Sequence, residues 1–327
     1  MRPAMVQADV VIVGGGPAGA ACAAHLKKNG VDVRILDKKV FPRTKLCAGW
    51  ISPDVFNSLA CSPETYPYPL TRLDRIHFHL FGTRIPVKTR QYAVRRCEFD
   101  NWLIRRAEVP VHTHQVGKIR KDGSWYVIDD QFACRYLVGA GGTHCPVRRT
   151  FEDPLQLRPD RALISAVEKE FQAPCRIPEC HIWYLDQGLP GYCWYLPKKG
   201  GWINIGIGGK QHRLASRGTT IMKHWRNFIH RLLQQGFVDH HPESPRGHTY
   251  FLRHKPVDLG RENVFLAGDA AGLSTIDMGE GIHAAIQSGV AAADSIISGR
   301  PVCLDHISRF SLPKLLTSGL KKTSLPA

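Results

Sequence analysis

The feature that most constrains this chain is a glycine-rich turn between a short apolar run and an alanine-rich stretch. Residues 9–13 (DVVIV) are followed by Gly14, Gly16 and Gly19, which have the spacing GxGxxG. A β-branched run of this length is typical of a buried parallel strand, and the alanine-rich stretch that ends at Gly30 favours a helix. The order of strand, turn and helix predicts a dinucleotide-binding unit.

Each part of this unit has a physical task. Gly14 permits the tight turn, Gly16 lets the backbone approach a pyrophosphate, and Gly19 allows helix and strand to pack closely. Ala18 belongs to the first helical turn, whose free N–H groups would face the phosphates. We therefore expect these four residues to bind the cofactor.

A carboxylate ends the second strand of the unit, which we expect over residues 31–36. Asp37 stands where an acidic side chain accepts hydrogen bonds from the adenosine ribose and repels a 2′-phosphate. The unit therefore disfavours NADP.

Length and composition place limits on the rest. The 327 residues suffice for two domains. Ten scattered cysteines without a signal peptide favour free thiols in a reducing compartment. The formal charge of +16 would attract phosphates or anionic lipids, but without a nucleic-acid-binding motif we expect no nucleic-acid partner. The histidines lack a matching ligand set, so no metal is expected.

A second motif lies towards the other end of the chain. Residues 264–296 combine a strand, a Gly-Asp pair and a small-residue helix, and they resemble the second FAD fingerprint of glutathione-reductase-like flavoproteins. By this resemblance Asp269 binds the ribityl chain or a pyrophosphate-bound water. The helix that starts near Gly281 and Ile282 would point its positive end at the flavin pyrimidine. The expected cofactor is therefore FAD.

The region between these motifs matches the same class. Residues 136–149 (YLVGAGGTHCPVRR) resemble a segment of flavin monooxygenases and reductases, but Gly141 and Gly142 stand where monooxygenases commonly have Asp and Gly. This departure weakens a hydroxylase interpretation. By the same resemblance Arg96, just before a further expected helix, would lie against the FAD, and Val116 would also contact it.

Two further segments narrow the match to the geranylgeranyl reductase family. Residues 41–53 (FPRTKLCAGWISP) are similar to that family's PxxKxCGGG stretch, and residues 191–209 (GYCWYLPKKGGWINIGIGG) resemble its YxWxFPKxxGxxNVGLG signature. Halogenases of the same superfamily carry a related WxWxIP run. The chain is identified as a member of the reductase family, with a resemblance that covers residues 8–300.

The resemblance implies a reaction. The family hydrogenates carbon–carbon double bonds in isoprenoid chains, with a hydride from reduced FAD and a proton from a second group. Cys47 and Gly49 would contact the flavin, and Cys47, Tyr192 or water would deliver the proton. An apolar substrate pocket would be lined by Tyr192, Trp194, Pro197 and Lys198. The alternative is that these aromatic side chains only pack the sheet.

The expected fold class is α/β, with a Rossmann-like FAD-binding domain around a central parallel sheet and an inserted, mainly antiparallel β-sheet substrate domain. The FAD-binding domain would comprise residues 1–70, 90–150 and 255–300, and the substrate domain residues 71–89 and 151–254. Residues 301–327 are expected to form a short, basic, solvated tail. Such a tail would leave the pocket open, completed by a partner chain, or suited to a smaller substrate.

The leading hypothesis is an enzyme, an FAD-dependent oxidoreductase that reduces double bonds of an apolar small molecule or lipid. A monooxygenase or halogenase is the first alternative, and a flavoprotein with structural FAD that acts as a partner or maturation factor is the second. The electron donor is left open between NAD(P)H and a reduced carrier protein. Since no apolar run is long enough to span a bilayer, we expect a cytoplasmic protein, and peripheral contact at the inner face of the membrane is left open.

Overall fold

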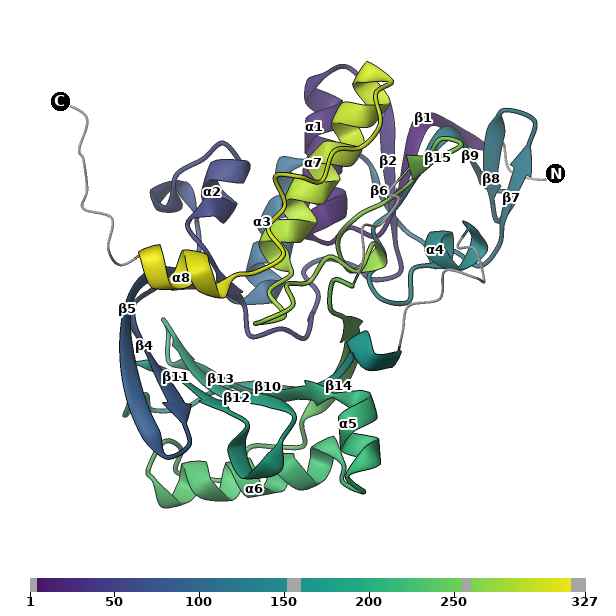
Figure 1. Cartoon of the computed structure of the whole chain (residues 1–327). Coiled ribbons are helices and arrows are strands. Elements are labelled where there is room, and N and C mark those ends of the chain that lie inside the picture. Colours follow the sequence, from purple (N-terminus) through teal and green to yellow (C-terminus); the bar gives the residue numbers. More distant parts are fainter. Residues whose placement is uncertain (1–4, 152–159, 255–259, 319–327) are drawn as a thin grey trace.

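The computed structural model describes residues 5–151, 160–254 and 260–318, and two sheets organise them (Figure 1). The first sheet contains β1 (Val6–Val13), β2 (Val33–Asp37), β6 (Val111–Thr113), β7 (Ile119–Asp122), β8 (Trp125–Ile128), β9 (Phe132–Gly139), β15 (Gly260–Arg261) and β16 (Val264–Leu266). Its order is β15-β16-β9-β1-β2-β6, with β8 also beside β9 and β7 beside β8. The pairs β1–β2, β1–β9, β9–β16 and β2–β6 are parallel. This is the parallel sheet that the glycine-rich motif predicts.

The second sheet contains β3 (Trp50–Ile51), β4 (Thr71–Leu80), β5 (Thr83–Ala93), β10 (Leu163–Gln172), β11 (Cys180–Tyr184), β12 (Gly191–Lys198), β13 (Trp202–Lys210) and β14 (Arg246–Phe251). Its order is β14-β10-β13-β12-β11-β4-β5-β3. Every pair is antiparallel except β11–β4. The predicted α/β fold class is confirmed, while the division into domains at the residue boundaries given above stays a prediction.

Helices cover both sheets. The helices beside the first sheet are α1 (Pro17–Lys28), α3 (Arg96–Arg106), α4 (Pro146–Phe151) and α7 (Ile282–Ser298), with α2 (Asp54–Ser58) beside α7. The face of the second sheet that is turned away from the first is covered by α5 (Gln211–Ser216) and α6 (Ile221–Gln234) (Figure 1). The opposite face of β5 is covered by α8 (Leu312–Ser318). The two sheets therefore enclose a space with helix ends on one side and a β-sheet floor on the other.

The small residues of α7 have a packing role that the sequence does not predict. They pack α7 against α1, where a Cβ added at Gly289 would lie 2.2 Å from the Ala18 carbonyl oxygen. Close packing of these two helices brings their N-termini to the same end of the first sheet, as Figure 1 shows.

The segment after α7 differs from the expected solvated tail. Ile307 and Leu315 are each only 3% exposed. Asp277 accepts hydrogen bonds from the backbone N–H groups of Ser311 (3.0 Å) and Leu312 (2.8 Å), and so caps the start of α8. Residues 319–327 lie outside the described residues. Within the described ranges, no helix has the length and apolar character needed to cross a bilayer.

Candidate active site

One cavity of about 900 Å³ is lined by residues from both sheets. We call one part of it the dinucleotide half, which is formed by Gly14, Gly16, Ala18, Asp37, Val116, Asp269, Gly281 and Ile282. We call the other part the apolar half, which is formed by Trp50, Ile182, Tyr192, Trp194, Met278 and Leu315. Both FAD motifs of the sequence therefore meet at a single cavity that the second sheet also lines.

The glycine turn has the geometry that its spacing predicts. Gly14 has φ +111°, and a Cβ there would lie 2.4 Å from the Ala140 carbonyl oxygen. A Cβ at Gly19 would lie 1.9 Å from the Gly14 carbonyl oxygen, so Gly19 packs helix against turn and does not line the cavity. At Gly16, by contrast, the nearest atom is 3.5 Å away and the residue lies on the cavity. The surface at Gly16 is therefore open to a ligand.

The carboxylate of Asp37 stabilises the glycine turn by hydrogen bonds and also lines the cavity. It accepts hydrogen bonds from the N–H groups of Gly15 (2.8 Å, Oδ2) and Lys39 (2.9 Å, Oδ1). Each carboxylate oxygen has a second lone pair, so a ribose hydroxyl can still donate to it. The buried Nε of Arg43, also on the cavity lining, has no hydrogen-bond partner within the described part of the chain. A cradle of close backbone, an acceptor and an unpaired guanidinium donor fits the adenosine diphosphate part of FAD.

The second motif supplies the opposite wall. Asp269 accepts a hydrogen bond from the Ser274 hydroxyl (3.2 Å), and α7 begins at Ile282 after Gly281. The partly buried Glu280 accepts the N–H of His283 (2.8 Å), and desolvation raises the pKa of its carboxyl to about 7. The α7 N-terminus that was expected to face the flavin therefore lies on the cavity, beside a carboxyl that the sequence did not identify.

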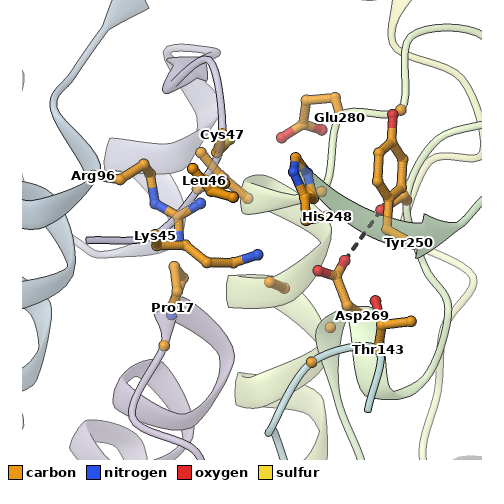
Figure 2. A pocket seen from close by; sticks show the side chains of 18 of the residues that line it. Pro17, Lys45, Leu46, Cys47, Arg96, Thr143, His248, Tyr250, Asp269 and Glu280 are labelled. Carbon is orange, nitrogen blue, oxygen red and sulfur yellow. Dashed lines mark hydrogen bonds between the residues drawn. The ribbon is translucent and has the colours of Figure 1, made fainter. Parts of the chain in front are cut away.

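Cys47 and Arg96 lie across the cavity from this wall. Figure 2 shows Arg96, Lys45 and Cys47 on one side and Asp269 on the other, with the side chains pointing into the space between. Arg96 donates two hydrogen bonds to the fully buried Asp100, at 2.7 and 3.0 Å. Burial lowers the pKa of Arg96, but Asp100 and Cys47 outweigh this effect and hold it above its usual value.

The apolar half is built on the aromatic signature. The Trp194 ring lies against Gly206, where an added Cβ would be 2.1 Å from Cζ2, and its Nε1 donates to Asn204 Oδ1 (2.7 Å). The Tyr192 hydroxyl donates to the Met278 carbonyl oxygen, and burial raises the pKa of Tyr192 well above its usual value. The only proton of the Tyr192 hydroxyl is thus already engaged, which makes Tyr192 a poor proton donor.

Besides Gly19, three expected site residues do not line the cavity. Pro197 and Lys198 lie outside its lining, and the buried Lys198 Nζ pairs with Glu170 at 2.6 Å. Gly49 is also absent from the lining: it has φ +76°, and an added Cβ would lie 2.0 Å from the Val94 carbonyl oxygen. Close backbone contact, rather than contact with a ligand, accounts for this glycine.

The chain itself covers one side of the apolar half. Ile307, Phe310 and Leu315 line the cavity, and Asp277 fixes the segment that carries them. The expectation of an exposed tail is therefore wrong for the described residues 301–318, because Ile307 packs against Leu273 and Ala284 and Leu315 packs on the second sheet.

Sequence reasoning missed several polar residues of the cavity. These are Arg43, Lys45, Glu168, His248, Tyr250 and Glu280. In β10 the sequence VEKEF looks like an exposed charged strand, yet Glu168 is only 3% exposed. Strand alternation could have placed Glu168 on the same face as Ala166, but it could not show that this face is buried.

Comparisons with known proteins agree with this geometry. The family model for FAD-dependent oxidoreductases matches residues 9–83. An uncharacterized protein of Methanosarcina barkeri is 30% identical over 323 residues, which cover 90% of this chain and 76% of that protein. The geranylgeranyl diphosphate reductase of Rhodobacter capsulatus is 26% identical over 327 residues, which cover 90% and 78%.

Solved structures share the fold. A geranylgeranyl bacteriochlorophyll reductase-like protein from Thermoplasma acidophilum aligns with a TM-score of 0.79 at 18% identity, over 90% of this chain and 80% of that one. The flavin-dependent halogenase CmlS aligns with a TM-score of 0.71 at 21% identity, over 90% and 58%. The fold and the matched motifs define an FAD-dependent oxidoreductase. Within that class, the chain belongs to the geranylgeranyl reductase family.

Proposed function

We propose that this protein binds FAD in the dinucleotide half and reduces carbon–carbon double bonds of an apolar, isoprenoid-like chain in the apolar half. The observation that carries the proposal is that both halves belong to one cavity of about 900 Å³. A polar wall from the two FAD motifs continues into aromatic and aliphatic side chains without a protein layer between them. The name of the Rhodobacter relative, a geranylgeranyl diphosphate reductase, agrees with such a substrate.

The roles of the residues follow from their positions. Asp37 would accept the ribose hydroxyls, Asp269 would bind the ribityl or pyrophosphate region, and the N-termini of α1 and α7 would face negative charge. FAD, when bound and reduced, supplies the hydride. Trp194 and its apolar neighbours would exclude water and hold the double bond in reacting geometry.

Cys47 is placed where it could serve both halves. It lines the same cavity as Arg96 and Tyr192. We propose that Cys47 contacts the flavin and keeps its place as a candidate for proton delivery, whereas the engaged hydroxyl of Tyr192 argues against that role for Tyr192.

The test is anaerobic mixing. The protein is loaded with FAD, photoreduced, and mixed with geranylgeranyl diphosphate. Flavin absorbance is followed during the reaction, and the mass of the product is measured by mass spectrometry. We expect reoxidation together with a gain of two hydrogens per reduced double bond. Flavin that stays reduced and a substrate of unchanged mass would contradict the proposal.

The fold likeness to CmlS supports a second candidate, a flavin-dependent halogenase or monooxygenase. This candidate requires rapid reaction of the reduced protein with oxygen and a transient oxygenated flavin spectrum. Stopped-flow mixing with aerated buffer distinguishes the two, because a reductase should react with the alkene faster than with oxygen. The same instrument identifies the electron donor, by adding NADH, NADPH or a reduced carrier protein to the oxidised form.

We further propose peripheral contact with an anionic bilayer at one end of the second sheet. Four large apolar residues are exposed there: Leu80 (36%), Phe81 (84%), Ile85 (45%) and Leu185 (49%). They gather because Ile85 is paired with Phe78, and β11 runs parallel to β4 with Trp183 beside His79. An exposed apolar cluster of this kind is typical of an interaction surface.

The basic side chains of this hairpin and the apolar surface that leads to it from the cavity favour a lipid bilayer as the partner. Arg75, Arg84 and Lys88 are exposed on the same hairpin, and basic residues near a membrane attract anionic headgroups. The apolar floor of the cavity continues towards this end, from Ile182 to the stacked rings of Phe78 and Tyr184. A prenyl chain drawn from the bilayer would therefore meet apolar surface along its path.

Vesicle sedimentation tests this contact. We expect binding to phosphatidylglycerol vesicles that falls with added salt and falls in Phe81→Ser. The matched control is Val40→Ser, since Val40 is 70% exposed outside the cluster. Equal binding by both variants would contradict the proposed surface.

A further inference from the structure

A buried glutamate without a complete set of partners lies on the cavity wall. Glu168, in β10, accepts the Cys47 N–H with Oε1 at 2.7 Å. Its other oxygen, Oε2, is buried and has no hydrogen-bond partner in the ranges 5–151, 160–254 and 260–318. Such an orphan acceptor costs free energy when the carboxyl is ionised, and it suits a carboxyl that carries a proton.

A chain of charged side chains leads from Lys198, close to Glu168, towards solvent. Lys198, whose side chain is 2% exposed, pairs with Glu170 at 2.6 Å, and Glu170 is 22% exposed. Arg95 bonds Glu170 at 3.0 Å and Glu98 at 2.9 Å. Each step from Lys198 outwards is within hydrogen-bonding distance, and the side chains beyond Lys198 are all more exposed than Lys198 itself.

Lys198 also lies next to the loop that Glu168 holds. A Cβ added at Gly49 would be 3.0 Å from Lys198 Nζ, and Cys47, two residues earlier, donates to Glu168. The ammonium group and the carboxyl therefore approach the same short loop from β12 and β10. This position explains why Lys198 lies behind the cavity wall rather than on it.

The charges around Glu168 oppose one another. Burial raises the pKa of its carboxyl to about 7, Lys198 and the Cys47 N–H act to lower it, Glu170 acts to raise it and Lys45 to lower it. The titratable and charged groups that face Glu168 are Lys198 from β12, Glu170 from β10, Lys45 and Cys47 from the loop after β2, and Arg246 and Tyr250 from β14. A carboxyl in this setting can both hold and release a proton near neutral pH.

We propose that Glu168 delivers the proton to the substrate, and that the charge of the nearby Lys198 tunes this carboxyl. This inference rests on the proposed function. One alkene carbon takes the hydride from the reduced flavin, whose two electrons form the first new C–H bond. The π pair of the alkene forms the second C–H bond with the proton of Glu168. The carboxylate that remains takes a proton from solvent before the next turnover.

Single-turnover kinetics test the assignment. The reduced, FAD-loaded protein is mixed anaerobically with geranylgeranyl diphosphate from about pH 5 to about pH 9, a range centred on the expected titration. In the wild type we expect the rate to fall as pH rises through about 7, because the carboxyl loses its proton. Glu168→Gln should slow the reaction about a hundredfold or more and abolish this pH break.

Two further variants separate chemistry from folding. Lys198→Gln should move the break to higher pH, because a neighbouring positive charge that favours ionisation is lost. Glu168→Asp should restore a pH break at a reduced rate. The control is Glu243→Gln, which should match the wild type. The Glu243 carboxyl is 87% exposed and pairs with Lys169, which belongs to β10 like Glu168.

A spectroscopic measurement needs no turnover. In the oxidised protein, the infrared band of a protonated carboxyl should disappear as pH rises through about 7, and Glu168→Gln should lack this change. If the wild type reduces the alkene while Glu168→Gln has the same rate and pH profile, the inference is wrong and the proposed function stands. If the wild type does not reduce the alkene, the proposed function fails first.

Discussion

The two halves of the cavity are built in different ways. The dinucleotide half consists mainly of backbone: a turn at Gly14, an open surface at Gly16, and the N-termini of α1 and α7. The apolar half consists of side chains such as Tyr192 and Trp194 on the second sheet, and one side is covered by the segment that Asp277 caps. The nucleotide surface thus depends on local geometry, whereas the substrate surface depends on packing between distant segments.

The largest expected effect concerns the backbone half. Gly19→Ala would place a Cβ 1.9 Å from the Gly14 carbonyl oxygen, so either helix or turn must move. We expect the free energy of unfolding to fall by about 3 kcal/mol, measured by denaturant titration. Gly16→Ala is the matched control. Its Cβ would meet only ordinary contact at 3.5 Å, so stability should hold while FAD affinity falls. Equal stability losses in the two variants would contradict the different tasks of these glycines.

A similar substitution in the apolar half should act on the substrate. Gly206→Ala forces the Trp194 ring away from the sheet, because the added Cβ would lie 2.1 Å from Cζ2. We expect a loss of about 2 kcal/mol in stability and a larger rise in KM for the prenyl substrate than in the Kd for FAD. Titrations of both ligands measure this ratio. An equal loss of FAD affinity would mean that the two halves do not act separately.

Acid should weaken the second sheet through its histidines. Burial lowers the pKa of His79 to about 4 and that of His181 to about 3, with the Arg84 charge and neighbouring histidines acting in the same direction. The unfolded chain therefore binds more protons than the folded state in this pH range. The free energy of unfolding should fall as pH drops from about 6.5 towards 4. His181→Gln should reduce the slope by at most about 1.4 kcal/mol per pH unit.

Fluorescence of Trp183, which stacks on both histidines, can follow this transition. An unchanged dependence of the free energy of unfolding on pH in His181→Gln would show that His181 does not cause the loss of stability in acid.

The smallest expected effect concerns the covering segment. Asp277→Ala removes the acceptor for the N–H groups of Ser311 and Leu312, and the loss of such a cap costs about 1 kcal/mol. We expect faster proteolysis between α7 and α8 and a lower affinity for the prenyl substrate, with the affinity for FAD unchanged. Retained protease resistance would mean that packing of Leu315 alone holds the segment.

What the sequence could predict follows the same division. The GxGxxG spacing, Asp37 and the Gly-Asp pair predict the parallel sheet and the residues around the nucleotide, because each depends on neighbours within a few positions. Lys198 and Glu168 could not be assigned in this way. Whether a lysine faces a substrate or a buried glutamate depends on how β10, β12 and the loop after β2 pack together. This packing cannot be predicted from the local sequence. The same holds for Leu315, whose partner surface lies on β4 and β5.

A titration of the oxidised, FAD-loaded protein with a geranylgeranyl compound, followed by the flavin absorbance spectrum, tests whether cofactor and apolar chain share one cavity. If one cavity holds cofactor and apolar chain side by side, the flavin bands should shift saturably, and the shift should weaken in Gly206→Ala. A compound that binds, as measured by calorimetry, without any change in the flavin spectrum would contradict the shared cavity.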